Sequence, residues 1–133
     1  MLQKLFTPQA IAVVGASHTE GKVGHSLMKN LVGHGYKGKI YPVNPKAEEI
    51  MGLKCVPDIN SLPAGVDLAV IAIPASAVPQ TLRDCGEAGV GAAVIGRADR
   101  REAGDAGRRL EEEVRAVAAD FGIRLLGPNC LGY

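Results

Sequence analysis

Residues 13–24 read VVGASHTEGKVG. The two valines end an apolar run that begins at Ile11, glycines interrupt the residues that follow, and Val23, Leu27 and Leu31 then recur at helical spacing. Glycines let a backbone turn tightly and approach a ligand closely. A helix start presents unpaired N–H groups and the positive end of its dipole, which suits a phosphate. The stretch therefore predicts a strand, a loop and a helix arranged around a phosphate-bearing ligand.

Composition sets wide bounds on the function. The 133 residues are enough for one domain with its own core, and 15 Lys+Arg against 14 Asp+Glu give a net charge of +1, with no strong attraction to nucleic acid or anionic lipid. No apolar run approaches the roughly 20 residues of a membrane span, and the N-terminus does not read as a secretory signal. Three widely spaced cysteines predict neither a zinc site nor a disulfide framework, so we expect a reduced, cytoplasmic setting and a core role for Cys85.

Strand and helix patterns alternate along the chain. Apolar runs predict strands at 11–15, 39–44, 66–73, 92–95 and 123–126, and helical spacings predict helices at 23–33, 78–88 and 110–121. Residues 48–52 read as a short helix or turn, and residues 54–63 as irregular chain with room for one extra short strand. The order predicts an α/β fold: one Rossmann-like, doubly wound domain with a five- or six-stranded parallel sheet and helices on both faces.

Pro42 lies inside the second predicted strand. A proline cannot donate to a strand ladder, so it either interrupts the middle of that strand or marks the end of the sheet.

The loops after the five strands are the expected ligand positions, because ligands of such sheets lie beyond the carboxyl ends of the strands. These loops cover residues 15–24, 44–46, 74–76, 96–101 and 127–130. The loop at 96–101 carries acidic and basic residues, whereas the other four loops are rich in Gly, Pro, Asn or Ser.

The first two loops depart from the common nucleotide motifs. Ser17 stands where the dinucleotide fingerprint G-x-G-x-x-G has its second glycine, and Lys22 is not embedded in a Walker A sequence. After the second strand an NAD site would carry a carboxylate, whereas this chain has Asn44, Pro45 and Lys46. A lysine there suits a phosphorylated ribose, as in NADP or coenzyme A. The plain alternatives are an ordinary strand–helix corner and a solvated surface lysine.

Five stretches, in this order, make the interpretation more specific: GAS at 15–17, GKVG at 21–24, IYPVNPK at 40–46, VDLAVIAIPA at 66–75 and LGPNCLG at 126–132. Together they resemble the N-terminal CoA-binding domain of the NDP-forming acyl-CoA synthetases. That group includes ADP-forming acetyl-CoA synthetase and, more distantly, the alpha subunits of succinyl-CoA synthetase. The resemblance extends from Leu5 to Gly132.

The resemblance implies binding of coenzyme A or acyl-CoA. The glycine loop would wrap the phosphates through backbone N–H groups, residues 44–46 would meet the adenosine end with Lys46 near the 3′-phosphate, residues 73–75 would form an apolar wall, and residues 128–130 would lie near the thiol. Ordinary core, turn or buried-thiol roles are the alternatives for Ile73, Pro74 and Cys130. The implied cofactor-binding residues are Gly15, Ala16, Ser17, Gly21, Lys22, Val23, Gly24, Asn44, Pro45, Lys46, Ile73, Pro74, Ala75 and Asn129.

The fourth loop departs from this family. It reads GRADRR at residues 96–101, where the family carries a small apolar stretch. Its arginines suit an added anion site, but a solvated loop paired locally with Asp99 and Glu102 is the favoured interpretation. His18, His25 and His34 are expected on the surface or in loops, because the phosphohistidine of related synthetases lies in the domain that follows.

No catalytic triad, carboxylate dyad or metal cluster is visible in the sequence, so we expect binding without turnover by residues 1–133 alone. The resemblance implies the N-terminal domain of a longer acid–CoA ligase or a free-standing CoA-binding protein. In the first case its partners would be an ATP-grasp domain and a phosphohistidine domain, and no nucleic acid or membrane is expected. An NADP-binding redox or sensor domain and a non-enzymatic regulatory module with a vestigial pocket stay open.

Overall fold

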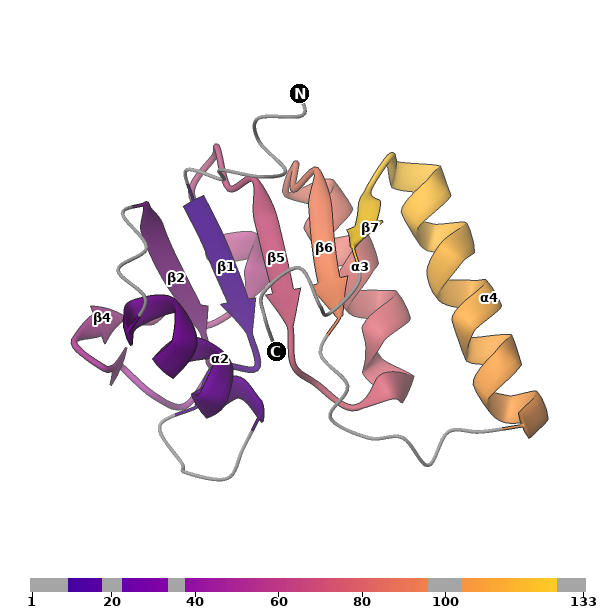
Figure 1. Cartoon of the computed structure of the whole chain (residues 1–133). Helices are drawn as coiled ribbons and strands as arrows, with labels where there is room; N and C mark the ends of the chain where they lie inside the picture. The colour runs from indigo at the N-terminus through magenta and orange to yellow at the C-terminus, as the bar shows by residue number, and fades with distance from the viewer. Residues whose placement is uncertain (1–9, 18–22, 34–37, 96–103, 127–133) are drawn as a thin grey trace.

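A five-stranded parallel sheet forms the centre of the molecule (Figure 1). The computed structural model describes residues 10–17, 23–33, 38–95 and 104–126. The strand order is β2-β1-β5-β6-β7, and every neighbouring pair is parallel. The chain therefore reverses its direction of winding between β1 and β5, which confirms the predicted doubly wound α/β fold. The strands are β1 (Ala10–Val14), β2 (Lys39–Val43), β5 (Leu68–Ile71), β6 (Ala92–Ile95) and β7 (Arg124–Leu126).

Both faces of the sheet are buried, which explains the continuous apolar runs in the sequence. Along β1, Ile11 and Val13 belong to one cluster of core residues, whereas Ala12 and Val14 belong to another. This alternation follows from the two-residue period of a strand, whose successive side chains point to opposite faces. Each face therefore needs its own helical cover.

The helices supply that cover. Helix α2 (Val23–Gly33) packs Leu27 and Met28 into one core cluster. On the other face, α3 (Val78–Glu87) and α4 (Gly104–Phe121) pack side by side and contribute Leu82 and Val117 to the second cluster (Figure 1). The predicted helices are thus confirmed, and none of the described helices is long and apolar enough to cross a membrane.

One segment differs from the prediction. Residues 48–52 do not form a short helix: β3 (Glu49–Ile50) and β4 (Leu53–Lys54) pair antiparallel as a hairpin. Its turn is Met51–Gly52, with left-handed φ angles of 51° and 79°, the backbone that two-residue hairpin turns require. The alternative prediction of a turn is correct, but the strands on either side of it were not expected.

The predicted irregular segment 54–63 does contain extra strand structure, since Lys54 ends β4. That strand belongs to the separate two-stranded sheet, so the parallel sheet of the described residues has five strands, to which Val56 adds one isolated parallel bridge at Val43. A short 3₁₀ helix, η1 (Ile59–Ser61), follows, and Asp58 caps it.

Pro42 lies on the outermost strand, which continues through it and pairs with β1. The carbonyl of Pro42 accepts a hydrogen bond from Val56 N at 2.9 Å, on the side away from β1. Because the N–H and C=O of one strand residue face the same side, the N–H that proline lacks would lie on this outer side. The proline therefore costs no hydrogen bond to β1. Of the two predictions for Pro42, the structure favours the second: the strand is not interrupted, and the proline lies where the sheet ends, on its outermost strand.

Candidate functional site

Three loops meet at the carboxyl ends of the strands, where the order of the sheet reverses. They follow β1 (residues 15–17), β2 (residues 44–47) and β5 (residues 72–74). Ala72 N donates a hydrogen bond of 2.8 Å to Val14 O and so joins the ends of β1 and β5. Most predicted site residues lie on these loops or on α2. Gly21, Lys22 and Asn129, together with the loop at 96–101, His18, His34 and Cys130, lie outside the described residues.

Gly15 forms the corner after β1. Its φ of +87° is a conformation that other residues rarely adopt. A Cβ atom at this position would overlap the carbonyl oxygen of Ala72 and lie 3.0 Å from Cγ2 of Ile73. The backbone after β1 is therefore packed directly against the loop after β5, and only glycine fits there.

Gly24 brings α2 onto the same corner. A Cβ atom at Gly24 would overlap the carbonyl oxygen of Gly15 and lie 3.2 Å from Cα of Ala16. The first turn of α2, which starts at Val23, thus lies against the loop after β1. This places the N-terminal end of a helix dipole at the point where the sheet reverses, as the sequence predicts for an anion site.

Ala16 lies in the loop after β1, and its side chain is part of the core. Only 2% of it is exposed, and its methyl group belongs to the core beneath α2. Its methyl group is therefore not available to a ligand. Its carbonyl oxygen accepts a hydrogen bond of 2.9 Å from Nδ2 of Asn44, on the loop after β2.

Asn44 is bonded on both sides of its amide. Its Oδ1 accepts hydrogen bonds from the backbone N–H groups of Lys46 at 2.7 Å and Ala47 at 3.0 Å. Its own backbone N–H donates to Val56 O at 3.0 Å. Sequence reasoning did not identify Val56 or this internal role of Asn44, although asparagine's habit of bonding to the backbone two or three residues on was the available signal.

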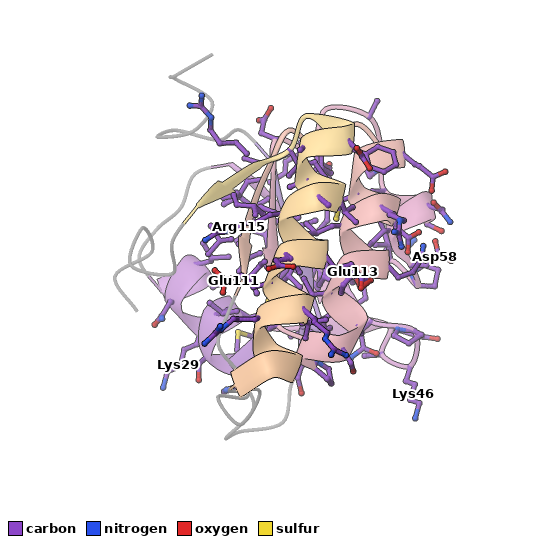
Figure 2. The ribbon with its side chains drawn as sticks, turned by 90° about the vertical axis from the view of Figure 1, so that its right-hand side faces the viewer. Lys29, Lys46, Asp58, Glu111, Glu113 and Arg115 are labelled. Atoms are coloured by element: carbon purple, nitrogen blue, oxygen red, sulfur yellow. The ribbon has the colours of Figure 1, made fainter. Side chains whose placement is uncertain are left out.

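Lys46 is exposed, and its side chain extends away from the ribbon (Figure 2). Among the described residues, no carboxylate forms an ion pair with it. The end of β2 thus presents a cation at residues 44–46, as the sequence predicts, together with exposed Pro45.

The loop after β5 contributes an apolar surface. Ile73 is half-buried against the core under α3, and Pro74 is exposed. Pro74 O accepts a hydrogen bond of 2.9 Å from Ala77 N, which closes the short 3₁₀ turn η2 (Ala75–Ala77) ahead of α3. The structure therefore brings Ile73 close to Gly15 while leaving Pro74 on the surface.

Two free cysteines lie among the described residues, and both are buried. Burial, reinforced by the charge of Asp84, raises the pKa of the Cys85 thiol to about 12, and burial with a smaller effect of Glu49 raises the pKa of Cys55. Both thiols stay protonated near neutral pH, and the fully buried Cys85 has the predicted core role. No metal-binding group of His, Cys, Asp or Glu occurs among the described residues.

A hollow of about 500 Å³ lies elsewhere, against the first residues of β2 and the β3–β4 hairpin. Apolar groups of Val32, Ile40, Met51 and Leu53 line it, with Lys39 and Lys54 beside them. None of the predicted site residues lines this hollow.

Comparison with known proteins gives consistent matches. A family described as "CoA binding domain" matches residues 9–133. Acetate–CoA ligase (ADP-forming) I of Archaeoglobus fulgidus is 47% identical over 131 residues, and the match covers 98% of this chain and 19% of that protein. The alpha subunit of acetate–CoA ligase (ADP-forming) I of Pyrococcus furiosus is 43% identical over 135 residues, which cover 98% of this chain and 29% of the subunit.

A solved structure agrees with these relatives. The dinucleotide-forming acetyl-coenzyme A synthetase 1 of Candidatus Korarchaeum cryptofilum, in complex with phosphate and ADP, superposes with a TM-score of 0.88 at 47% identity. The match covers 97% of this chain and 27% of that one. The chain therefore spans less than a third of the length of each of these three relatives.

Proposed function

The chain belongs to the CoA-binding domain family, and from that premise we propose that it binds coenzyme A or acyl-CoA at the carboxyl ends of β1, β2 and β5. The observation that carries the proposal is the packing of Gly24 on Gly15, which brings the first turn of α2 onto the loop at the sheet's reversal point. Unpaired N–H groups and a helix dipole there suit the diphosphate of the cofactor.

The other loops would hold the rest of the molecule. Lys46, exposed and without an ion-pair partner among the described residues, is proposed to bind the 3′-phosphate of the adenosine end. Ile73 and Pro74 offer apolar surface to the adenine and the start of the pantetheine arm. From the family resemblance we propose the remaining contacts, which are Ser17, Gly21, Lys22, Val23, Pro45, Ala75 and Asn129.

The wider role is proposed from the relatives. They are ADP-forming acetate–CoA ligases and an acetyl-coenzyme A synthetase, and this chain matches only a part of each. We propose that the chain serves as the CoA-binding domain of an acid–CoA ligase of this kind. The phosphate-relaying histidine and the nucleotide-binding ATP-grasp domain would then come from other domains or a partner subunit.

An NADP-binding domain is the second candidate, because a lysine after the second strand also suits the phosphorylated ribose of NADP. Isothermal titration of the protein with CoA, dephospho-CoA, NADPH and NADH separates the two. We expect CoA to bind, with dephospho-CoA about tenfold weaker because it lacks the phosphate proposed to meet Lys46. NADPH binding without CoA binding would overturn the proposal, and binding of none of the four would favour a regulatory module with a vestigial pocket.

Substitution of Lys46 sharpens this experiment. We expect Lys46→Ala to weaken CoA about tenfold and to leave dephospho-CoA nearly unchanged. Lys29→Ala is the matched control: it removes the same charge from an exposed position on α2, and the two lysines lie on opposite sides of the view in Figure 2. An equal effect of both substitutions would indicate general attraction of the anion and would exclude a 3′-phosphate site at Lys46.

A further inference from the structure

We propose that Asn44 is a positioning residue, which locks the loop after β2 to the loop after β1 and thereby fixes Lys46, and that its side chain is not itself a ligand of the cofactor. The inference rests on the proposed binding of CoA and names the residue on which its discrimination of the 3′-phosphate depends. Asn44 makes hydrogen bonds of 2.9, 2.7, 3.0 and 3.0 Å to four different residues.

The first bond joins the two loops. Nδ2 of Asn44 donates to the carbonyl of Ala16, a residue 28 positions earlier in the chain. Ala16 is itself held firmly, because its methyl group is buried and its Cα lies beneath the first turn of α2 at Gly24. The loop after β2 is therefore tied to a part of the backbone that cannot readily shift.

Two further bonds fix the chain around Lys46. Oδ1 of Asn44 accepts from the N–H groups of Lys46 and Ala47, so the backbone curls around the amide. The N–H of Asn44 donates to Val56 O, and Val56 N donates to the carbonyl of Pro42. The main chain that carries Lys46 is thus held from three directions, while the lysine side chain alone is free in solvent.

Only an amide of this length meets all of these demands. An aspartate could accept from the two N–H groups but has no donor for the Ala16 carbonyl, and its charge would repel an anionic ligand. A serine could keep a weaker version of the turn but is too short to reach Ala16. The side chain therefore combines a donor and an acceptor that serve two different loops.

The fixed backbone around Lys46 affects how strongly a ligand with a 3′-phosphate is preferred over one without it. A flexible lysine on a flexible loop loses much conformational freedom when it binds, and this loss offsets the gain from its charge. Fixing the backbone in advance reduces that loss. Asn44 should therefore control the preference for CoA over dephospho-CoA although its side chain touches neither.

The test measures CoA and dephospho-CoA affinities by titration calorimetry for the wild type, Asn44→Ala and Asn44→Ser. From the preference of about tenfold expected for the wild type, Asn44→Ala should retain about threefold or less, and Asn44→Ser should lie between. Asn44→Ser also serves if Asn44→Ala folds poorly. In the Asn44→Ala background, Lys46→Ala should change CoA affinity much less than in the wild type, because the two residues act as a unit.

Asp58→Ala is the matched control. Oδ1 of Asp58 accepts hydrogen bonds of 2.9 Å from both N and Oγ of Ser61, so this substitution also removes a turn held by a side chain, one that none of the three loops contributes to. It should lower the melting temperature but leave the ligand preference unchanged. Hydrogen exchange without ligand adds a second readout: the N–H groups of Lys46 and Ala47 should exchange faster in Asn44→Ala than in the wild type.

The outcomes are distinguishable. If the wild type does not bind CoA, the proposed function fails, and the positioning role fails with it. If the wild type binds and Asn44→Ala keeps the full preference for CoA, only the positioning role fails. Additive effects of the Asn44 and Lys46 substitutions would also overturn the inference, because a residue that acts by positioning Lys46 should have little effect on the phosphate preference once Lys46 is gone.

Discussion

Two glycines in this molecule let neighbouring segments touch, and they do so in different ways. At Gly24 the space of a side chain is filled by the backbone carbonyl of Gly15, at the edge where ligand binding is proposed. At Gly86, on α3, the same space is filled by the ring of Phe121, at the last residue of α4. A carbonyl inside a packed corner cannot move away, whereas Phe121 is 42% exposed and can shift with the end of α4. The candidate site is therefore shaped by main chain, and the helical layer behind it by side chains that can adjust.

The largest expected effect comes from Gly24→Ala. The added methyl group must displace the backbone of Gly15, so we expect a loss of about 3 kcal/mol or more in the free energy of unfolding, together with loss of CoA binding. Urea denaturation and calorimetry measure the two effects. Gly33→Ala, in the same helix but with no atom within 4 Å of the added carbon, should change stability by less than about 1 kcal/mol. A Gly24→Ala protein as stable as the wild type would show that the backbone of Gly15 can move away from the added methyl group.

The second-largest expected effect tests whether water reaches the buried side chains of α3. Cys85 precedes Gly86 on α3, and its pKa lies at about 12, compared with the ordinary value of 9.0 that applies in the unfolded chain. Above pH 9 the unfolded chain loses this proton and the folded protein retains it, so stability must fall as pH rises from about 9 towards 12. By pH 10.5 the loss from this thiol should reach about 2 kcal/mol.

Comparison with Cys85→Ala isolates this contribution, because the two proteins differ only at this side chain. The stability of the wild type, measured by denaturation at pH 7.5 and pH 10.5, should fall more than that of the variant. Equal decreases would mean that water reaches the thiol and that the layer is less tightly closed than its burial indicates.

Gly86→Ala should have a smaller effect than Gly24→Ala. Its methyl group would meet the ring of Phe121, and the end of α4 must shift, at an expected cost of about 1 kcal/mol after the gain in helix propensity. In the Phe121→Gly background the cost should disappear, since the ring and the Cβ atom that obstruct the added carbon are both gone. Thermal denaturation of the four proteins of this cycle gives the coupling, and a cost that persists without the ring would contradict the assignment.

The smallest expected effect lies on the outer surface of α4. Arg115 Nη2 lies 2.8 Å from Glu111 Oε1, but the two side chains are 72% and 61% exposed. Glu111→Gln should therefore cost only about 0.3–0.5 kcal/mol, and the difference should vanish in 1 M salt. Glu112→Gln, one residue further along the same helix, is the control. A larger effect would show that surface charges contribute to this layer as much as its packing does.

The sequence predicts the positions of the five strands of the parallel sheet closely. The observed bounds of β1, β2, β6 and β7 lie within one residue of the predicted ones, whereas the apolar run at 66–73 contains the shorter strand β5, because apolar spacing alone does not mark where a strand ends. The β3–β4 hairpin escapes prediction because two-residue strands have no periodicity to detect. Its turn also places Met51 in a left-handed conformation, which a sequence pattern does not favour for that residue.

The candidate site is predictable as a set of loops but not as a set of contacts. Glycines and prolines mark the loops, and the alternation of strands and helices places them at one edge of the sheet. The bond between Asn44 and Ala16, in contrast, depends on tertiary packing across 28 positions of sequence. The close approach of Gly24 to Gly15 is equally a property of the folded chain: Gly15 lies in the loop after β1 as predicted, whereas Gly24, predicted in the same loop, lies in the first turn of α2.

Pro42 has a consequence for the behaviour of concentrated solutions. The outer strand of an open sheet is a template on which another copy of a chain can grow, and this is a common route to aggregates. Here the outward N–H at the fourth residue of that strand is missing, and Val56 already occupies the carbonyl beside it. A second copy of the chain could not form the full set of hydrogen bonds to this strand, because one N–H donor is missing. We therefore expect Pro42→Val to aggregate more readily than the wild type during refolding.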